Sequence, residues 1–184
     1  RSGEIETVIA AVPDLYGRLM GKRFTGRFFA DTVSEHGWHA CDYLLACDME
    51  MDPVPGYRFT SWETGYGDMK AMPDWETVRR AAWLPATAIV LCDVCKDPDG
   101  AAIEVAPRRI LHTQVQRAAR MGLVPKGGTE LEVYLFKETY DSARKKAYHN
   151  LATHGAYVED YHLFQGTKEE PVIGEVYHTE DGKP

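Results

Sequence analysis

The chain has 184 residues, a mass of 20.7 kDa and a net charge of −7, and at about 150 residues per domain it predicts one large domain or two small ones. With 44% hydrophobic residues it can bury a core, which excludes wholesale disorder. The acidic balance and the lack of any apolar run approaching about 18 residues argue against nucleic-acid and membrane partners.

The apolar patterns of the first half of the chain predict a sheet with one short helix. The predicted strands are residues 4–12, 18–24, 38–49, 65–73 and 86–95. Turn residues between the first two strands make them a hairpin. Residues 28–37 predict the helix, which ends at Gly37 because glycine commonly stops a helix at its C-terminus. Residues 50–61 contain Met-Asp-Pro-Val-Pro-Gly and predict a loop.

The pattern changes near residue 103, where we place a domain boundary between residues 1–103 and 104–184. Pro107 opens a helix in its first turn, where the missing N–H of proline is tolerated, and Gly122 stops it. Apolar residues recur at helical spacing between these two points. They are Ile110, Leu111, Val115, Ala118 and Ala119. Residues 130–136 predict one further strand.

The four cysteines are Cys41, Cys47, Cys92 and Cys95, which are few for a disulfide frame. Cys92 and Cys95 are three residues apart on a predicted strand, so their side chains point to opposite faces. A zinc knuckle needs both on one tight turn and a second pair of ligands. We therefore expect buried or incidental thiols rather than a metal site.

Two carboxylates stand side by side at the start of the last predicted strand. The strand period places Glu130 and Glu132 on one face, with Cα atoms roughly 6.5–7 Å apart. Like charges at this spacing raise the pKa of one carboxyl unless a cation compensates them, and Mg²⁺ or Mn²⁺ suits such oxygen ligands. The alternative is an exposed strand face in water, and the spacing alone favours that alternative.

Five stretches between residues 13 and 136 carry a pattern that one protein family shows in the same order. Residues 128–136 read Gly-Thr-Glu-Leu-Glu-Val-Tyr-Leu-Phe, a Gly-x-Glu-x-Glu pattern followed by an apolar, aromatic-rich run. The other four stretches are residues 13–23, 67–74, 91–93 and 106–111. Together they resemble the glutamine synthetase family: its N-terminal hairpin, its Met-Pro-Asp turn, the last strand of its first domain, the helix that opens its second domain and its first active-site strand.

The resemblance implies an α+β fold and a reaction. Residues 1–103 would form an N-terminal β-grasp domain, and residues 104–184 the first part of a catalytic domain built on a curved antiparallel sheet with helices. The implied enzyme is a carbon–nitrogen ligase of nitrogen metabolism that uses ATP to phosphorylate the γ-carboxylate of glutamate. Ammonia or an amine then displaces phosphate from the γ-glutamyl phosphate and leaves a γ-glutamyl amide.

The same resemblance implies site residues, cofactors and partners. Glu132 would bind the metal near glutamate and Glu130 the metal near the nucleotide phosphates. Mg²⁺ or Mn²⁺ would neutralise charge on the transferring phosphoryl group. The implied protein is cytoplasmic and forms a ring-shaped homo-oligomer, dodecamer-like at full length, in which the β-grasp domain of one subunit completes the active site of its neighbour.

One departure from the family pattern bears on the acceptor. Family enzymes that use ammonia carry an Asp-Gly-Ser-Ser loop whose aspartate binds and deprotonates ammonium. The corresponding region here contains Asp52-Pro-Val-Pro-Gly and Ser61-Trp-Glu63 instead. Asp52 or Glu63 can substitute for the missing aspartate, and the alternative is that each is a solvated loop residue. Branches that use polyamines or other amines relax this loop, so an amine acceptor is favoured.

Length is the second departure. Family catalytic domains continue for some hundreds of residues and supply further metal-binding glutamates and phosphate-binding arginines. Residues 177–184 resemble an Asp-Gly-Lys segment found further downstream in the family, so we hypothesise that residues 176 and 177 are joined across missing sequence. We expect this chain alone to make no γ-glutamyl amide. The alternative is a non-catalytic glutamine-synthetase-like fragment or module that acts in assembly or binding.

Overall fold

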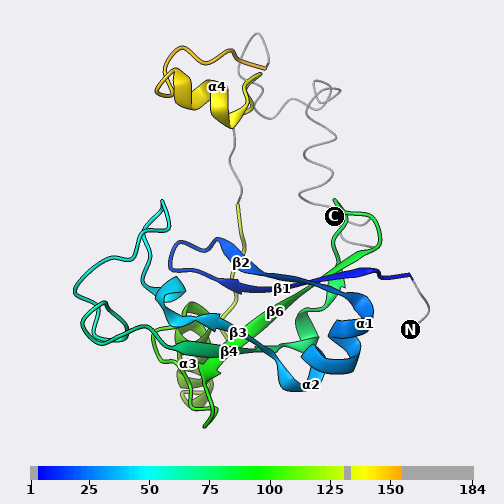
Figure 1. Cartoon of the computed structure of the whole chain (residues 1–184), viewed down its shortest axis with the longest axis vertical. Helices are drawn as coiled ribbons and strands as arrows, with labels where there is room; N and C mark the ends of the chain where they lie inside the picture. The colour runs from blue at the N-terminus through cyan, green and yellow to red at the C-terminus, as the bar shows by residue number, and fades with distance from the viewer. Residues whose placement is uncertain (1–3, 131–133, 155–184) are drawn as a thin grey trace. The chain divides into compact units, whose positions relative to one another are not determined.

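The computed structural model describes residues 4–130 and 134–154, and the chain divides into two compact units, Arg1–Pro125 and Lys126–Pro184. The first unit is built on a mixed sheet (Figure 1). Its strands are β1 (Thr7–Pro13), β2 (Leu19–Thr25), β3 (Trp38–Cys41), β4 (Asp68–Pro73), β5 (Arg79–Arg80) and β6 (Thr87–Lys96). The order is β2-β1-β6-β4-β3, with β5 also paired to β6. Only the β1–β6 pair is parallel among these strands.

A helical segment connects β2 to β3. It consists of α1 (Gly26–Phe28), a π-helical turn (Phe29–Val33) and α2 (Ser34–His36). Thr25 caps its start by accepting a hydrogen bond from the Phe28 N–H. The segment ends where the sequence predicts, at Gly37, whose φ of +69° favours glycine. A hairpin, a helical segment and a last strand parallel to the first make the β-grasp arrangement, and the predicted α+β class is confirmed.

The main hydrophobic core packs the helical segment against the sheet. Its buried members are Val8, Ala10, Val12, Phe29, Val33, Trp38, Ala71, Val90 and Cys92. Trp38 donates a hydrogen bond from Nε1 to Cys92 Sγ at 3.4 Å, which satisfies the one polar atom of this buried indole. At about 25 cal/mol per Å² of apolar surface removed from water, this core is the principal source of stability in the unit.

A second buried cluster joins Leu45 and Met69 to Ile103 and Ala106. The first compact unit therefore extends beyond the expected boundary at residue 103. The start of the following helix, α3 (Pro107–Arg120), packs with the sheet. The helix begins and ends as predicted, with Pro107 in its first turn and Gly122 at φ +74° just after it. The domain division at residues 103 and 104 itself remains a prediction.

One sequence expectation meets a different local structure, and a second falls partly outside the described residues. The strand predicted over residues 38–49 ends at Cys41, because residues 42–45 form a 3₁₀ turn. Of the strand predicted at residues 130–136, residues 131–133 lie outside the described part, and Phe136 makes a single bridge to Thr153. In the second unit, α4 (Tyr140–Lys145) starts with a reciprocal cap between Thr139 and Ser142. Among the described helices, none is long and apolar enough to cross a membrane.

Candidate functional site

The segment between β3 and β4, residues 42–67, carries both acidic residues that the sequence singled out for the acceptor. We call it the β3–β4 connection. Asp42 holds the two ends of the connection together. Its Oδ1 accepts hydrogen bonds from Thr60 Oγ1 at 2.7 Å and from the Gly67 N–H at 3.2 Å. The Asp42 N–H donates back to the Gly67 carbonyl at 2.9 Å. Thr60 is buried, so the base of the connection is fixed in the fold.

Asp52 lies in a tight turn within this connection. The Asp48 carboxylate accepts hydrogen bonds from the backbone N–H groups of Glu50 at 2.9 Å and Asp52 at 3.0 Å. The Asp48 N–H in turn donates to the Asp52 carbonyl at 3.0 Å. Asp52 itself is exposed. Its backbone therefore has a defined position, while its side chain lies at the surface of the first unit.

An arginine from the β1–β2 hairpin holds the same turn. Arg18 donates from Nε to Asp14 Oδ2 at 2.6 Å, from Nη1 to the Met49 carbonyl at 2.7 Å and from Nη2 to the Asp48 carbonyl at 3.1 Å. Burial alone would raise the pKa of Asp14, but the hydrogen bonds from Arg18 and Tyr16 hold that pKa below its ordinary value. Sequence reasoning missed this clamp; its only signal was an aspartate and an arginine four residues apart across a turn.

Glu63 lies beside an exposed tryptophan in the turn at residues 61–65. Ser61 and Gly65 pair as a bridge, the Thr64 N–H donates to Ser61 Oγ at 3.2 Å, and Gly65 has φ +81°. Trp62 is 83% exposed. Hydrogen bonds from its own backbone and from Ser61 lower the pKa of Glu63, so its carboxylate remains charged below its usual range. A charged carboxylate of this kind can pair with an ammonium group.

Aromatic rings connect this turn to the base of the connection. The Trp62 ring contacts Tyr66 with centroids 6.3 Å apart and planes at 60°. Tyr66 in turn contacts Tyr43 at 5.9 Å and 75°. We refer to Tyr43, Trp62 and Tyr66 as the aromatic ladder. Sequence reasoning did not single out these residues, because nothing local in a Ser-Trp-Glu run says that the tryptophan is left in solvent.

The predicted metal ligands are only partly described. Glu130 is exposed, and Glu132 lies outside the described residues. Within residues 4–130 and 134–154, no group of three His, Cys, Asp or Glu side chains could hold a metal ion. The described residues therefore do not form a metal site by themselves, and the assignment of Glu130 and Glu132 as ligands remains a prediction.

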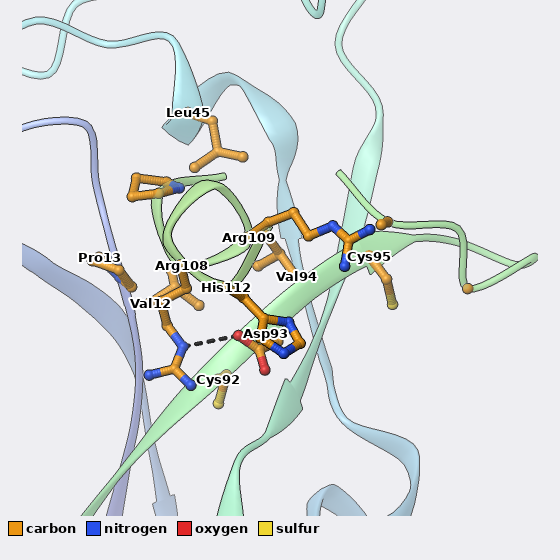
Figure 2. Close-up of a pocket in the computed structure, with 13 residues that line it drawn as sticks. Val12, Pro13, Leu45, Cys92, Asp93, Val94, Cys95, Arg108, Arg109 and His112 are labelled. Atoms are coloured by element: carbon orange, nitrogen blue, oxygen red, sulfur yellow. Dashed lines mark hydrogen bonds and ion pairs between the residues drawn. The ribbon is translucent and has the colours of Figure 1, made fainter. Parts of the chain in front are cut away.

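A pocket of about 180 Å³ lies between β6 and the start of α3 (Figure 2). Arg108 of α3 donates from Nε to Asp93 of β6 at 2.8 Å (Figure 2). Arg108 also pairs with Asp74. Burial alone would lower the pKa of Arg108, but the two carboxylates raise it. Because the guanidinium is already neutralised by two carboxylates, this pocket is better understood as the place where α3 is fastened to the sheet than as an anion site.

Comparison with known proteins gives relatives of one kind, although no protein-family model matches the chain. The chain is 42% identical over 172 residues to the γ-glutamylethanolamide synthetase GlnA4 of Streptomyces coelicolor, covering 94% of this chain and 37% of that protein. It is 25% identical to a glutamate–isopropylamine ligase of Pseudomonas sp., again over 94% of this chain and 37% of the relative. The chain thus spans little more than a third of the length of these curated relatives.

The fold of the chain also resembles that of a solved structure. The structure of apo GmaS matches 66% of this chain and 25% of its own length, with a TM-score of 0.50 and 26% identity. The curated relatives match this chain through the N-terminal part of their own chains.

Proposed function

Because the chain is homologous to the N-terminal part of the glutamine synthetase family of ligases, we propose that the whole protein joins an amine to the γ-carboxylate of glutamate, using ATP. The observation that carries this proposal is the 42% identity to a γ-glutamylethanolamide synthetase over 94% of the chain. A second relative, a glutamate–isopropylamine ligase, supports an organic amine rather than free ammonia as the acceptor.

The proposed reaction has two steps. An oxygen of the glutamate γ-carboxylate attacks the γ-phosphorus of ATP, forming γ-glutamyl phosphate and releasing ADP. The neutral amine nitrogen then attacks the γ-carbonyl carbon, the C–N bond forms, and the C–O bond to phosphate breaks. An alkylammonium ion must lose a proton before it can attack, so the acceptor side of the site requires a carboxylate that binds the cation and accepts that proton.

Asp52 and Glu63 are the carboxylates that we propose for the acceptor side. Both lie on the β3–β4 connection and both are exposed. The lowered pKa of Glu63 keeps its carboxylate charged, which favours binding of the ammonium ion rather than acceptance of its proton. Glu130 and Glu132 are proposed as ligands of the Mg²⁺ or Mn²⁺ that would neutralise the phosphoryl charge, together with ligands from outside the described residues. The ring-shaped homo-oligomer and the cytoplasmic location remain part of this proposal.

A panel of acceptors tests the proposed function. The whole protein is supplied with ATP, glutamate and Mg²⁺, and with ammonium, ethanolamine, isopropylamine or putrescine in turn. We expect phosphate release with at least one organic amine at a higher kcat/KM than with ammonium, and a product with the mass of the γ-glutamyl amide. Phosphate release that occurs only with ammonium would contradict the proposal. So would a lack of phosphate release with all four acceptors.

Charge-removing variants test the acceptor carboxylates. We expect Asp52→Asn or Glu63→Gln to raise the KM for the amine with little change in the KM for glutamate. Glu76→Gln is the matched control, since Glu76 is an exposed acidic residue outside the β3–β4 connection. Equal effects of all three variants on both substrates would exclude Asp52 and Glu63 from acceptor binding.

A further inference from the structure

The turn at residues 61–65 combines a fixed base with an unburied tryptophan. Thr60 and Ser61 are buried, and their hydroxyls hold the base through Asp42 and Thr64. Trp62, next in sequence, is 83% exposed. A tryptophan left in water forgoes the large stabilisation that burying it would supply. An exposed indole on a turn that is held by hydrogen bonds therefore indicates that Trp62 contacts a molecule outside the first unit.

The net charge of the β3–β4 connection, which carries this tryptophan, favours a cation as that contact. The β3–β4 connection contains five acidic residues and one basic residue, Arg58. The acidic residues are Asp42, Asp48, Glu50, Asp52 and Glu63. The face of an indole ring attracts cations by its quadrupole, and tryptophan is the strongest side chain in this respect. An exposed indole next to a carboxylate, as Trp62 is next to Glu63 in the chain, suits the recognition of an organic ammonium ion.

We propose that Trp62, supported by Tyr66 and Tyr43, contacts the organic substituent and ammonium group of the acceptor amine and so selects alkylamines over ammonia. This inference rests on the proposed function and names the group that sets its acceptor specificity. An alkylammonium ion offers apolar surface as well as charge, and each buried CH₂ contributes about 0.8 kcal/mol. Ammonium offers charge alone and is strongly hydrated, so it gains less from an aromatic face.

The test compares two exposed tryptophans in the whole protein. Trp62→Ala is measured against Trp83→Ala, because Trp83 is 55% exposed and lies outside the connection. Both are assayed by phosphate release with isopropylamine and with ammonium, at varied glutamate. We expect Trp62→Ala to lower kcat/KM for isopropylamine by about tenfold, with a much smaller effect on ammonium and an unchanged KM for glutamate. Trp62→Phe should retain part of the selectivity, and Trp83→Ala all of it.

Four results would overturn the inference, and one of them also bears on the proposed function. An equal loss for isopropylamine and ammonium, or an equal effect of Trp83→Ala, would show that Trp62 does not select the acceptor. A change in molecular mass of the Trp62→Ala protein, measured by light scattering, would show instead that the tryptophan contacts another copy of the same chain. A wild-type protein inactive with every acceptor would refute the proposed function itself, whereas an active wild type with unchanged selectivity in Trp62→Ala refutes only this inference.

Discussion

The Arg18 guanidinium bridges a buried carboxylate and a turn that carries a proposed acceptor residue. Removing it leaves Asp14, 4% exposed, with a buried charge and fewer donors. Arg18 is itself about a third exposed, so we expect Arg18→Ala to lower the free energy of unfolding by about 1–3 kcal/mol in urea denaturation. Arg27→Ala is the control, since Arg27 is 93% exposed and should cost under about 0.5 kcal/mol. Equal effects would mean that the clamp is not stabilising.

Among the four cysteines, we expect the buried Cys92 to have the least reactive thiol. Desolvation by burial raises its pKa to about 11, although the hydrogen bond from Trp38 acts in the opposite direction. Its thiolate is therefore scarce at pH 8. We expect iodoacetamide to leave Cys92 unmodified in the folded chain and to modify it after unfolding in urea, as read by peptide mass spectrometry. The half-buried Cys41 serves as the internal comparison, and modification of Cys92 as fast as Cys41 would contradict the buried environment.

At the scale of elements, Gly37 decides how the helical segment joins β3. A Cβ at this position would lie 2.5 Å from the Ala71 carbonyl oxygen and 2.6 Å from Met72 Sδ, and its φ of +69° is one that other residues rarely adopt. We expect Gly37→Ala to lower the free energy of unfolding by at least about 2 kcal/mol, measured by urea denaturation. Gly56→Ala is a useful comparison, because Gly56 has φ +91° but open space around its Cα. A Gly37→Ala cost no larger than that of Gly56→Ala would mean that the backbone relieves the contact.

The α4 region depends on one carboxylate that gathers several donors. The Ala152 N–H, Lys146 and Ser142 all donate to Glu138 and lower its pKa to about 2. A depressed pKa in the folded state stabilises the fold fully above the unfolded value, near 4.5, and this contribution is lost as the pH falls from there towards 2. We expect the Ala152 amide to lose protection from hydrogen exchange over that pH range.

Glu138→Gln tests this assignment, because the amide cannot titrate. The variant should be less protected at pH 6 and should show little further loss between pH 4.5 and 2. Asp141→Asn removes an exposed carboxylate of the same element and should retain the wild-type pH dependence. Wild-type protection that stays constant down to pH 2 would contradict the role of Glu138.

Elements with local signals could be predicted from the sequence, and elements set by distant contacts could not. Gly37, Pro107 and Gly122 mark helix limits by their own backbone preferences, so these limits agree with the structure. The end of β3 at Cys41 depends on hydrogen bonds from Thr60 and Gly67 to Asp42, and no pattern within residues 38–49 contains that information. The apolar spacing in α3 likewise predicted a helix, yet Leu111 is 65% exposed, because spacing does not specify what covers a face.

The candidate site likewise contains residues that could be predicted from the sequence and residues that could not. Asp52 and Glu63 could be proposed because a loop motif was missing at their position, and both prove to lie on one connection. The exposure of Trp62 and the reach of Arg18 to the Asp52 turn follow from three-dimensional packing, so neither was predicted.

For the whole molecule, the described residues lack a metal centre, and the chain spans 37% of its two amine-ligase relatives. We therefore expect the 184-residue chain alone to release no phosphate from ATP with glutamate and any amine, because phosphoryl transfer needs more cation ligands than Glu130 and Glu132 provide. The whole protein under identical conditions is the positive control. Phosphate release by the isolated chain that is abolished by Glu132→Ala would contradict this expectation.

The parallel pairing of β1 with β6 has a consequence for synthesis on the ribosome. Thr7 pairs with Thr87, so β1 waits for β6, which is the last strand in chain order among the described strands of this sheet. At about 5–20 residues per second, the β1–β2 hairpin remains without its central neighbour for several seconds of translation. During that interval the inward face of β1, with Val8, Ala10 and Val12, lacks the part of its core that Val90 and Cys92 of β6 supply. This face of β1 thus stays open to misassociation until β6 leaves the exit tunnel, and synonymous codons that slow translation over residues 40–85 would prolong that exposure.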